Sequence, residues 1–345
     1  MMANDNANQA ILSSAGDMST VQAKYHDISS SHLNDRLTAV ESYIIPGYGA
    51  NAGTLVNGWV QESVANGLTR TTGTNAGIRL DQITQKTLWG AVSYWQGTSK
   101  YMSKIPTDDN SVASDDANYT AMEHHWDESF GYFGAALDYN TGYADDVDRK
   151  SSPYNDSNSD GSIDFKSEYN VGWAITAAKR DDCSACDINH DFTKTIFDAY
   201  LEGRTLITNQ ADLADILVQR DIVTNNWEKV VAAVSIHYVN NVASDIAGLI
   251  AAGDTAIVAG SDATADYENH WSEMRGYANG LLYNDFKVIT DANLDRILTV
   301  MGTAPVYPSN GNFDAMQAYH TSLVGEVRAI FKASYGFSDA NVAGW

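Results

Sequence analysis

Hydrophobic residues recur every three to four positions along most of this chain, which is the period of an amphipathic helix. The clearest segment is 81–102, with Ile83, Leu88 and Val92 on its apolar side. The alternation of apolar and polar residues that marks a half-buried strand is scarce, so the pattern predicts an all-α fold. The stretch 211–253 is too long for an ordinary helix and is expected to break near Asn225. Further helices are predicted at 32–44, 192–203, 291–302 and 313–336.

Polar stretches divide the helical segments. Residues 1–20 are polar and predict a flexible tail. Gly, Asn and Thr are frequent in 47–79, which predicts an irregular connection around a short apolar piece at 55–64. From about 138 to 190, Asp, Asn, Ser and Gly dominate and predict a linker. The expected architecture is a pair of duplicated helical-bundle halves, at 21–148 and 191–345, joined by an irregular Asp/Gly-rich linker at 149–190.

One ten-residue pattern occurs twice. The stretches EHHWDESFGY, from Glu123, and ENHWSEMRGY, from Glu268, both fit E-x-H-W-x-E-x-x-G-Y and start 145 residues apart (268 − 123). Asp115 or Asp116 could cap the first of these helices. On a helix, the His, Glu and Tyr of each copy share one narrow arc, and the Gly lets another helix approach. The two sets are His125, Glu128, Tyr132 with Gly131, and His270, Glu273, Tyr277 with Gly276.

An inward arc of this kind can bind a metal ion. An imidazole and a carboxylate one turn apart suit a single ion, and a tyrosine oxygen suits ferric iron. The second copy is the better candidate, because His237 lies in the preceding helix whereas the first half has Tyr94 and Trp95 there. Each His is expected to be neutral, since a nearby helix N-terminus disfavours its protonation. The alternative, equally open, is a buried His–Glu hydrogen bond that only packs the bundle.

The stretch DSNSDGSIDFKSE resembles a calcium loop. Asp156, Asn158 and Asp160 have the spacing of ligands 1, 3 and 5, and Gly161 takes the sharp turn at position 6. Glu168 falls at position 13 instead of 12. A structural calcium ion is therefore expected, and a plain polar linker is the alternative. The full expected ligand set is Asp156, Asn158, Asp160, Asp164 and Glu168.

Charge and cysteine content narrow the function further. There are 21 basic and 44 acidic residues, a net charge of −23, which argues against nucleic acid and anionic membrane surfaces and permits attraction of cations. No apolar run reaches the ~20 residues of a membrane span, and the first ten residues lack the apolar core of a signal peptide.

Low Lys content gives the look of an exported protein, in which Cys183 and Cys186 would form a disulfide. In a cytosolic protein they would be a redox or metal pair, which His190 could extend.

Four stretches carry a family resemblance: QKTLWGAVSYWQ, YLEGRTLI, WEKVVAAVSIHYVNN and HWSEMRGYANGL. Together they resemble a bacterial family of unknown function found among surface lipoproteins, which is similar to the imelysin-like proteins. Imelysin-like proteins carry an H-x-x-E motif in paired helical bundles and are associated with iron uptake and periplasmic metal binding. The resemblance implies that His125 with Glu128, and His270 with Glu273, are the motif positions. It also implies a periplasmic or cell-surface location, with membrane attachment only through a lipid anchor outside this sequence.

These observations lead to three expectations of function. The first is an exported metal-binding protein that captures or handles iron at an H-x-x-E site, with calcium in the linker loop and no nucleic-acid partner. The second is a non-catalytic cell-surface structural or interaction module, whose H-x-x-E pairs only pack the bundle. The third and weakest is a metallopeptidase, because the chain has neither H-E-x-x-H nor G-x-S-x-G.

Overall fold

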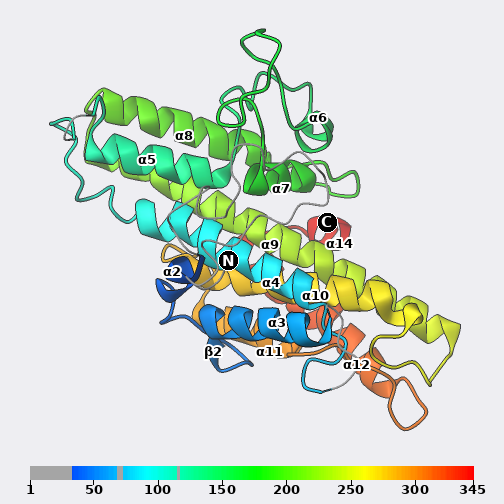
Figure 1. Cartoon of the computed structure of the whole chain (residues 1–345). Helices are drawn as coiled ribbons and strands as arrows, with labels where there is room; N and C mark the ends of the chain where they lie inside the picture. Colours follow the sequence, from blue (N-terminus) through cyan, green and yellow to red (C-terminus); the bar gives the residue numbers. More distant parts are fainter. Residues whose placement is uncertain (1–32, 68–72, 115–116) are drawn as a thin grey trace.

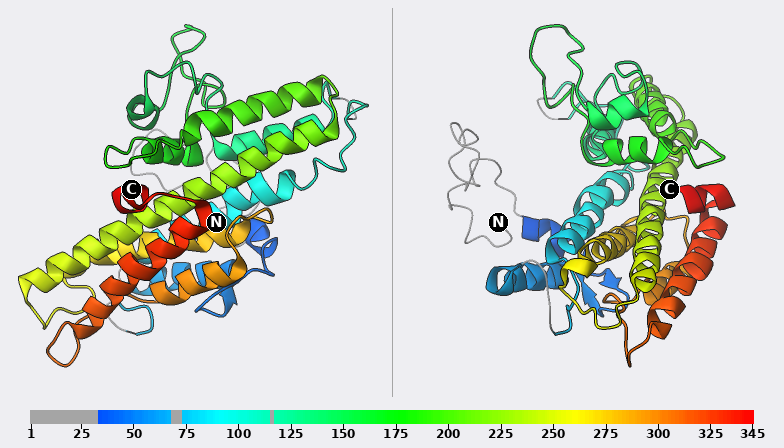
Figure 2. Two further views of the ribbon diagram at one scale, coloured as in Figure 1. Left: turned by 180° about the vertical axis from the view of Figure 1, so that it is seen from behind. Right: turned by 90° about the vertical axis from the view of Figure 1, so that its right-hand side faces the viewer.

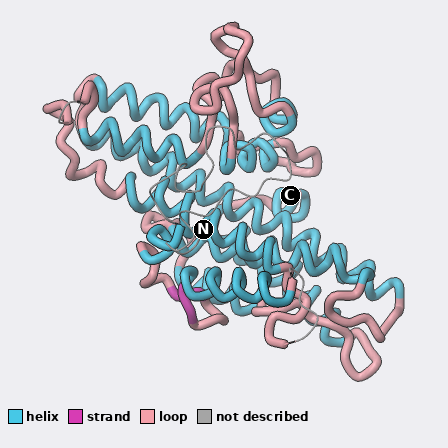
Figure 3. Tube along the Cα trace, viewed as in Figure 1, coloured by secondary structure: helices cyan, strands magenta, loops and turns pink. Residues whose placement is uncertain are grey.

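The computed structural model describes residues 33–67, 73–114 and 117–345, and the protein is predominantly helical (Figures 1 and 3). The predicted tail at 1–20 and the proposed caps Asp115 and Asp116 lie outside these residues. The described chain starts with α2 (Leu33–Thr38) and a two-stranded antiparallel hairpin of β1 (Ile44–Ile45) and β2 (Ala50–Asn51). The helix predicted at 32–44 is therefore shorter than its apolar spacing suggested.

A helix forms where an irregular connection was expected. Helix α3 spans Ala52–Asn66, within the Gly- and Asn-rich segment 47–79. It begins because the side chain of Asn51 accepts a hydrogen bond from the N–H of Thr54 at 2.9 Å, a side-chain N-cap. It persists because it buries Val56 and Trp59 in the core. The prediction of an irregular segment was wrong here, because capping and burial outweigh the low helix propensity of its Gly and Asn residues.

The segment predicted as one helix at 81–102 is helical throughout. It consists of α4 (Leu80–Leu88) followed by two π-helical stretches, η2 (Trp89–Tyr94) and η3 (Gln96–Tyr101). The first motif lies on α5 (Ala121–Phe133), whose cap is Thr120. The hydroxyl of Thr120 accepts from the N–H of Glu123, whose carboxylate accepts from the N–H of Thr120.

The segment predicted as a linker contains two helices. They are α6 (Asp146–Ser151) and α7 (Gly172–Asp181), and α7 buries Trp173 and Ala174 against the core. Only the loop between them, at 152–171, projects away from the helices (Figure 1). The Asp/Gly-rich composition therefore identified this loop but missed that α7 belongs to the packed interior.

The longest helix runs unbroken through the predicted break. Helix α9 spans Leu213–Ala252, 40 residues. At the polar pair Asn225–Asn226, the side chain of Asn226 donates to the carbonyl of Ile222 at 2.8 Å, so it bonds within the helix. The expected break near Asn225 was wrong. Buried Val223, Trp227 and Val230 continue the apolar face across the pair and hold it in the core.

The remaining helices complete the packing around α9. Helix α8 (Phe192–Thr208) precedes it, and η4 (Asp262–Thr264), α10 (Ala265–Gly280) and η5 (Leu281–Tyr283) follow. The chain ends with α11 (Asp291–Met301), α12 (Asp314–Ser322), η6 (Leu323–Val327), α13 (Arg328–Tyr335) and α14 (Asp339–Gly344). Among the described residues, no helix is both long enough and apolar enough to cross a bilayer.

Helix α9 lies at the centre of the packing (Figure 2). Helices α7, α8, α10, α12, α13 and α14 contact it directly, while α5 packs on α8 and α4 packs on α10. Helix α4 packs on α10, although Arg79 and Ser272, which share a 2.9 Å hydrogen bond, are 193 residues apart. A Cβ on Gly90 would lie 2.4 Å from the Cα of Gly280, so the two helix backbones nearly touch. Helices from both sides of the 149–190 segment therefore share one core.

Candidate functional site

The first motif directs its histidine away from its glutamate. Nδ1 of His125 is 2.7 Å from Oδ2 of Asp108, and its Nε2 is 2.8 Å from Nζ of Lys104. Both ring nitrogens are thus occupied by groups from the segment that follows η3. Glu128 instead approaches Nε2 of His124, at 3.8 Å. His125 and Glu128 lie on one arc, as predicted, but each faces a different partner.

The second motif repeats the histidine contact. Nδ1 of His270 is 2.7 Å from Oδ2 of Asp245, which lies near the end of α9. The Glu273 carboxylate accepts hydrogen bonds from the Tyr238 hydroxyl at 3.0 Å and from the Asn269 amide at 2.9 Å. Its Oε1 is also 3.4 Å from Nζ of Lys86 on α4. Glu273 is therefore neutralised inside the protein, and its lone pairs are largely used.

Both copies add a tyrosine pair that sequence reasoning did not find. Tyr101 stacks on Tyr132 with ring centres 5.8 Å apart, and Tyr238 stacks on Tyr277 at 5.5 Å. The aspartates that bind the histidines were missed as well. A signal was present, because Tyr and Asp are seven residues apart in both preceding segments: Tyr101 and Asp108, Tyr238 and Asp245. Searching for repeats outside the ten-residue pattern would have found this spacing.

The surroundings of the second motif change the expected ionisation of His270 and Tyr277. The hydrogen bond to Asp245 raises the pKa of His270, so the expectation that a helix N-terminus keeps this His neutral was wrong. The aspartate contact outweighs the helix dipole, because His270 is already in the second turn of α10. Burial, followed by the charge of Glu273, raises the pKa of Tyr277. Tyr277 is therefore a phenol, not a ready phenolate ligand.

Among the described residues, no hydrogen bond joins His237 to the His270 cluster. Its Nε2 is 3.3 Å from the side-chain amide nitrogen of Asn241. Burial, helped by the nearby charge of Arg180, lowers the pKa of His237 to about 4. His237 lines a small pocket with Arg180 and Trp345, on the side of α9 that faces α7 and α14. Its sequence position next to the second motif was thus a poor guide to its surroundings.

The described residues contain no group of three or more His, Cys, Asp or Glu side chains that could together hold a metal ion. In the calcium-like loop, the acidic side chains accept hydrogen bonds from within the loop. Asp156 accepts from the backbone N–H groups of Asp160 and Gly161, at 3.1 and 2.9 Å. Glu168 accepts from Ser157 and from the N–H of Asp164, at 2.8 and 3.0 Å. The loop is closed by hydrogen bonds that its own N–H groups and the Ser157 hydroxyl donate to these carboxylate oxygens.

Comparison with known protein families gives a match over most of the chain. The family described as a domain of unknown function (DUF4856) matches residues 11–265. The chain belongs to this family. The DUF4856 match contains the complete first motif and ends at the first residue of α10, so the second motif lies beyond it. Searches among curated proteins and among solved structures found no match. Nothing in these comparisons shows a relation to lipoproteins or imelysin-like proteins.

The turn that follows α7 in this DUF4856 protein contains both cysteines. Cys183 and Cys186 form a disulfide, with their Cα atoms 5.4 Å apart. The bond closes the turn that follows α7, and His190 packs elsewhere, stacked on Phe192 at 5.2 Å. Among the described residues the cysteines therefore pair with each other and not with His190.

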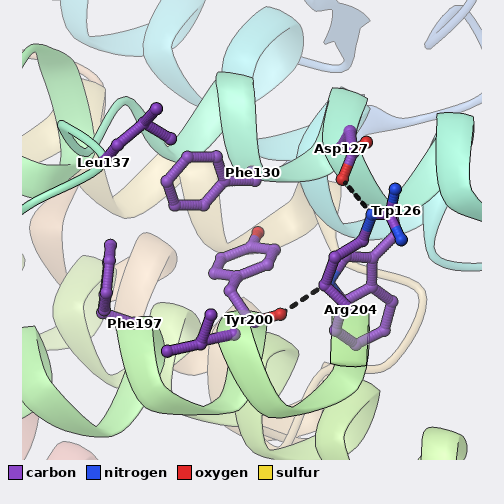
Figure 4. A pocket seen from close by; sticks show the side chains of 8 residues that line it. Trp126, Asp127, Phe130, Leu137, Phe197, Tyr200 and Arg204 are labelled. Carbon is purple, nitrogen blue, oxygen red and sulfur yellow. Dashed lines mark hydrogen bonds and ion pairs between the residues drawn. The ribbon is translucent and has the colours of Figure 1, made fainter. Parts of the chain in front are cut away.

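An apolar groove of about 160 Å³ lies between α5 and α8 (Figure 4). Trp126, Phe130 and Tyr200 line it, and the exposed side chain of Leu137 stands at one end. Arg204 closes the other end and is ion-paired with Asp127 at 2.9 Å. The Trp126 indole N–H donates to the Tyr200 carbonyl at 2.9 Å. The groove is formed by a different face of α5 from the one that carries His125 and Tyr132.

Proposed function

We propose that this protein is an exported metal-binding protein and that its working site is the second motif, with His270 as the ligand. The observation that carries the proposal is the Asp245–His270 hydrogen bond at 2.7 Å. A carboxylate on one ring nitrogen fixes the ring and raises the basicity of the other nitrogen, as in known metal sites. Among the described residues, no hydrogen bond reaches Nε2 of His270, and its side chain is 29% exposed. This nitrogen can bind an incoming ion once the imidazole has lost its second proton.

The surroundings of the first motif argue against metal binding by His125. There the Lys104 ammonium nitrogen lies 2.8 Å from Nε2 of His125. A cation approaching that nitrogen would have to displace a positive charge, which costs Coulomb energy. We therefore assign metal binding to His270 alone and a structural role to His125. Duplication of an ancestral helical unit would account for the geometry that the two motifs share.

The donor set predicts the character of the site. One imidazole with a carboxylate behind it leaves most coordination positions to water or to a chelator that arrives with the ion. Such an open site suits capture and release more than permanent storage, and imidazole accepts iron, zinc or copper. The resemblance to imelysin-like proteins favours iron and a periplasmic or cell-surface location. A metallopeptidase would need about three protein donors on its ion, and the described residues offer no such group.

The calcium loop is a secondary part of this proposal. Asp156, Asn158 and Asp160 keep ligand spacing, and calcium would replace part of their hydrogen bonds to the loop backbone. The ion would act structurally, by stiffening the projecting loop between α6 and α7.

The rival function is a non-catalytic structural or interaction module at the cell surface. The observation that favours it is Glu273, which Lys86, Tyr238 and Asn269 already satisfy. In this view the polar contacts of the second motif serve only to hold α4, α9 and α10 together. The H-x-x-E pairs then bind nothing from outside.

Titration of iron, zinc and copper into the wild type, His270→Ala and His125→Ala separates the two functions. We expect the wild type and His125→Ala to bind one ion and His270→Ala to bind none. The affinity should fall in acid, because the proton competes for Nε2. Equal binding by all three proteins, or no binding by the wild type, would leave the structural module as the better account. Circular dichroism of each variant controls for unfolding.

A further inference from the structure

Arg180 is a cation without a counter-ion in a strongly acidic protein. The chain has 44 acidic and 21 basic residues. Even so, Arg180 forms no ion pair with any described residue, and its buried Nε has no hydrogen-bond partner. The side chain is partly buried, and taking part of a charged guanidinium out of water without pairing it costs free energy. An arginine of this kind is expected where the missing partner comes from outside the chain.

One neighbour of Arg180 is a second cation. Lys179 lines the same pocket, which lies between α7, α9 and α14, together with His237, whose low pKa leaves it neutral. Asp182 is the one acidic side chain in that lining, and it is ion-paired with Lys150. Burial lowers the pKa of Arg180 to about 10, so the guanidinium remains charged at neutral pH. Burial and then the charge of Arg180 lower the pKa of Lys179, which shows that the two cations repel each other.

The walls of the pocket are fixed by covalent and hydrogen bonds. The disulfide-closed turn at 183–186 forms one side, and the Trp345 ring forms another. The Trp345 indole donates to the carbonyl of Arg180 at 2.9 Å, which anchors the end of α7. A Cβ on Gly344 would lie 3.0 Å from Ala185, so α14 is packed closely against the turn. The site is therefore preorganised, which lowers the entropy cost of binding.

The volume of the pocket limits its occupant. It measures about 180 Å³, below the roughly 300 Å³ at which pockets for drug-sized ligands begin. The planar guanidinium fork matches the oxygens of a carboxylate or phosphate group, and the Lys179 ammonium can donate a further hydrogen bond. We propose that Arg180 and Lys179, in the pocket beside His237, form a binding site for a small oxyanion such as phosphate or a small carboxylate.

Two ordinary explanations account for less of this geometry. Basic residues are favoured in the last turn of a helix by its dipole, and Arg180 and Lys179 lie there. That effect explains a basic residue at the surface, but it gives no partner to a buried Nε. The aromatic rings of Tyr238 and Tyr277 lie near Arg180. Neither hydroxyl forms a hydrogen bond with it among the described residues, so the guanidinium is not satisfied by them.

The test is anion-dependent stability and affinity of the full chain. Phosphate, sulfate, acetate and succinate are titrated separately at constant ionic strength, with chloride as the reference. Melting temperature and isothermal titration calorimetry are the two readouts. We expect at least one oxyanion to raise the melting temperature above that in chloride. Replacing Arg180 by methionine should weaken its binding about 10- to 100-fold, the value of a hydrogen bond to a charged group.

A matched pair keeps the proposal testable if Arg180→Met does not fold. Lys179→Gln and Lys166→Gln each remove one positive charge from an exposed position, so they change the net charge equally. Lys179 lines the pocket, and Lys166 lies in the loop between α6 and α7. We expect Lys179→Gln to weaken oxyanion binding about two- to five-fold, as for a partly solvated ion pair, and Lys166→Gln to leave it unchanged. Equal effects of the two variants, or no oxyanion effect on the wild type, would overturn the proposal.

Discussion

The two motif glycines give a matched test of the helix packing. Gly276 and Gly131 occupy the same place in the repeated pattern, but a Cβ would meet different surroundings. At Gly276 it would lie 2.6 Å from the Cβ of Lys86 and 3.2 Å from the carbonyl oxygen of Ile83. At Gly131 it would meet nothing within 4 Å. Substitution by alanine therefore adds the same atom to a closed and to an open position.

The expected energies follow from these distances. Alanine is favoured over glycine in a helix by about 1 kcal/mol, so Gly131→Ala should stabilise the protein by about 0.5–1 kcal/mol. At Gly276 the same gain is opposed, because carbon atoms need about 3.5–4 Å and α4 would have to move by about 1 Å. Overpacking of this kind costs about 1–3 kcal/mol. The two variants should then differ by about 1–3 kcal/mol, or about 2–6 °C in melting temperature.

Denaturant unfolding and differential scanning calorimetry, on both variants beside the wild type, measure this difference. Gly276→Ala should also loosen the contact between Lys86 and Glu273, since Lys86 carries the clashing atom. Equal stabilities of the two variants would refute the reasoning. So would a Gly131→Ala protein less stable than Gly276→Ala, because α10 would then not lie against α4 at this distance.

Three further outcomes follow from individual contacts. Asp245→Asn should lower the pKa of His270 in an NMR titration; in the wild type, the stabilisation by this contact is complete below the unfolded pKa of about 6.5 and is lost as the pH rises through the higher folded pKa. Reduction of the Cys183–Cys186 disulfide should cost about 2 kcal/mol or less in calorimetry, because the closed loop is short, and a double serine variant should match the reduced protein. Thr120→Ala should cost about 1 kcal/mol and increase amide exchange in the first turn of α5 only, since it removes the N-cap of that helix.

The sequence predicted the helical class because apolar periodicity is a local signal. The prediction failed where a polar residue can either interrupt a helix or form hydrogen bonds that stabilise it. A helix break was predicted near Asn225, but α9 continues there: the side chain of the next residue, Asn226, bonds within the helix, and Trp227 beside it is buried. Asn51 resembled a loop residue, but it caps α3. In each case tertiary burial, which one sequence does not reveal, decided the outcome.

The candidate site was predicted only as far as one helix determines it. The shared arc of His270 and Glu273 follows from helix geometry alone. Their partners Asp245 and Lys86 come from other helices, and their approach depends on how α4 and α9 pack on α10. Pairing of this kind cannot be read from spacing within one segment. The repeated seven-residue interval from Tyr238 to Asp245, matched in the first half, was the one local clue to it.

The packing of α4 on α10 sets an order for folding during synthesis. Arg79 and Ser272 are joined across 193 residues, and ribosomes add about 5–20 residues per second. The apolar face of α4, with Ile83 fully buried in the finished protein, thus waits on the order of 10–40 s for its partner. In contrast, α8, α9 and α10 are consecutive in the chain and can associate as they emerge. The nascent protein therefore passes through a stage in which the face of α4 that later packs on α10 is complete but uncovered, and a chaperone would have to protect it.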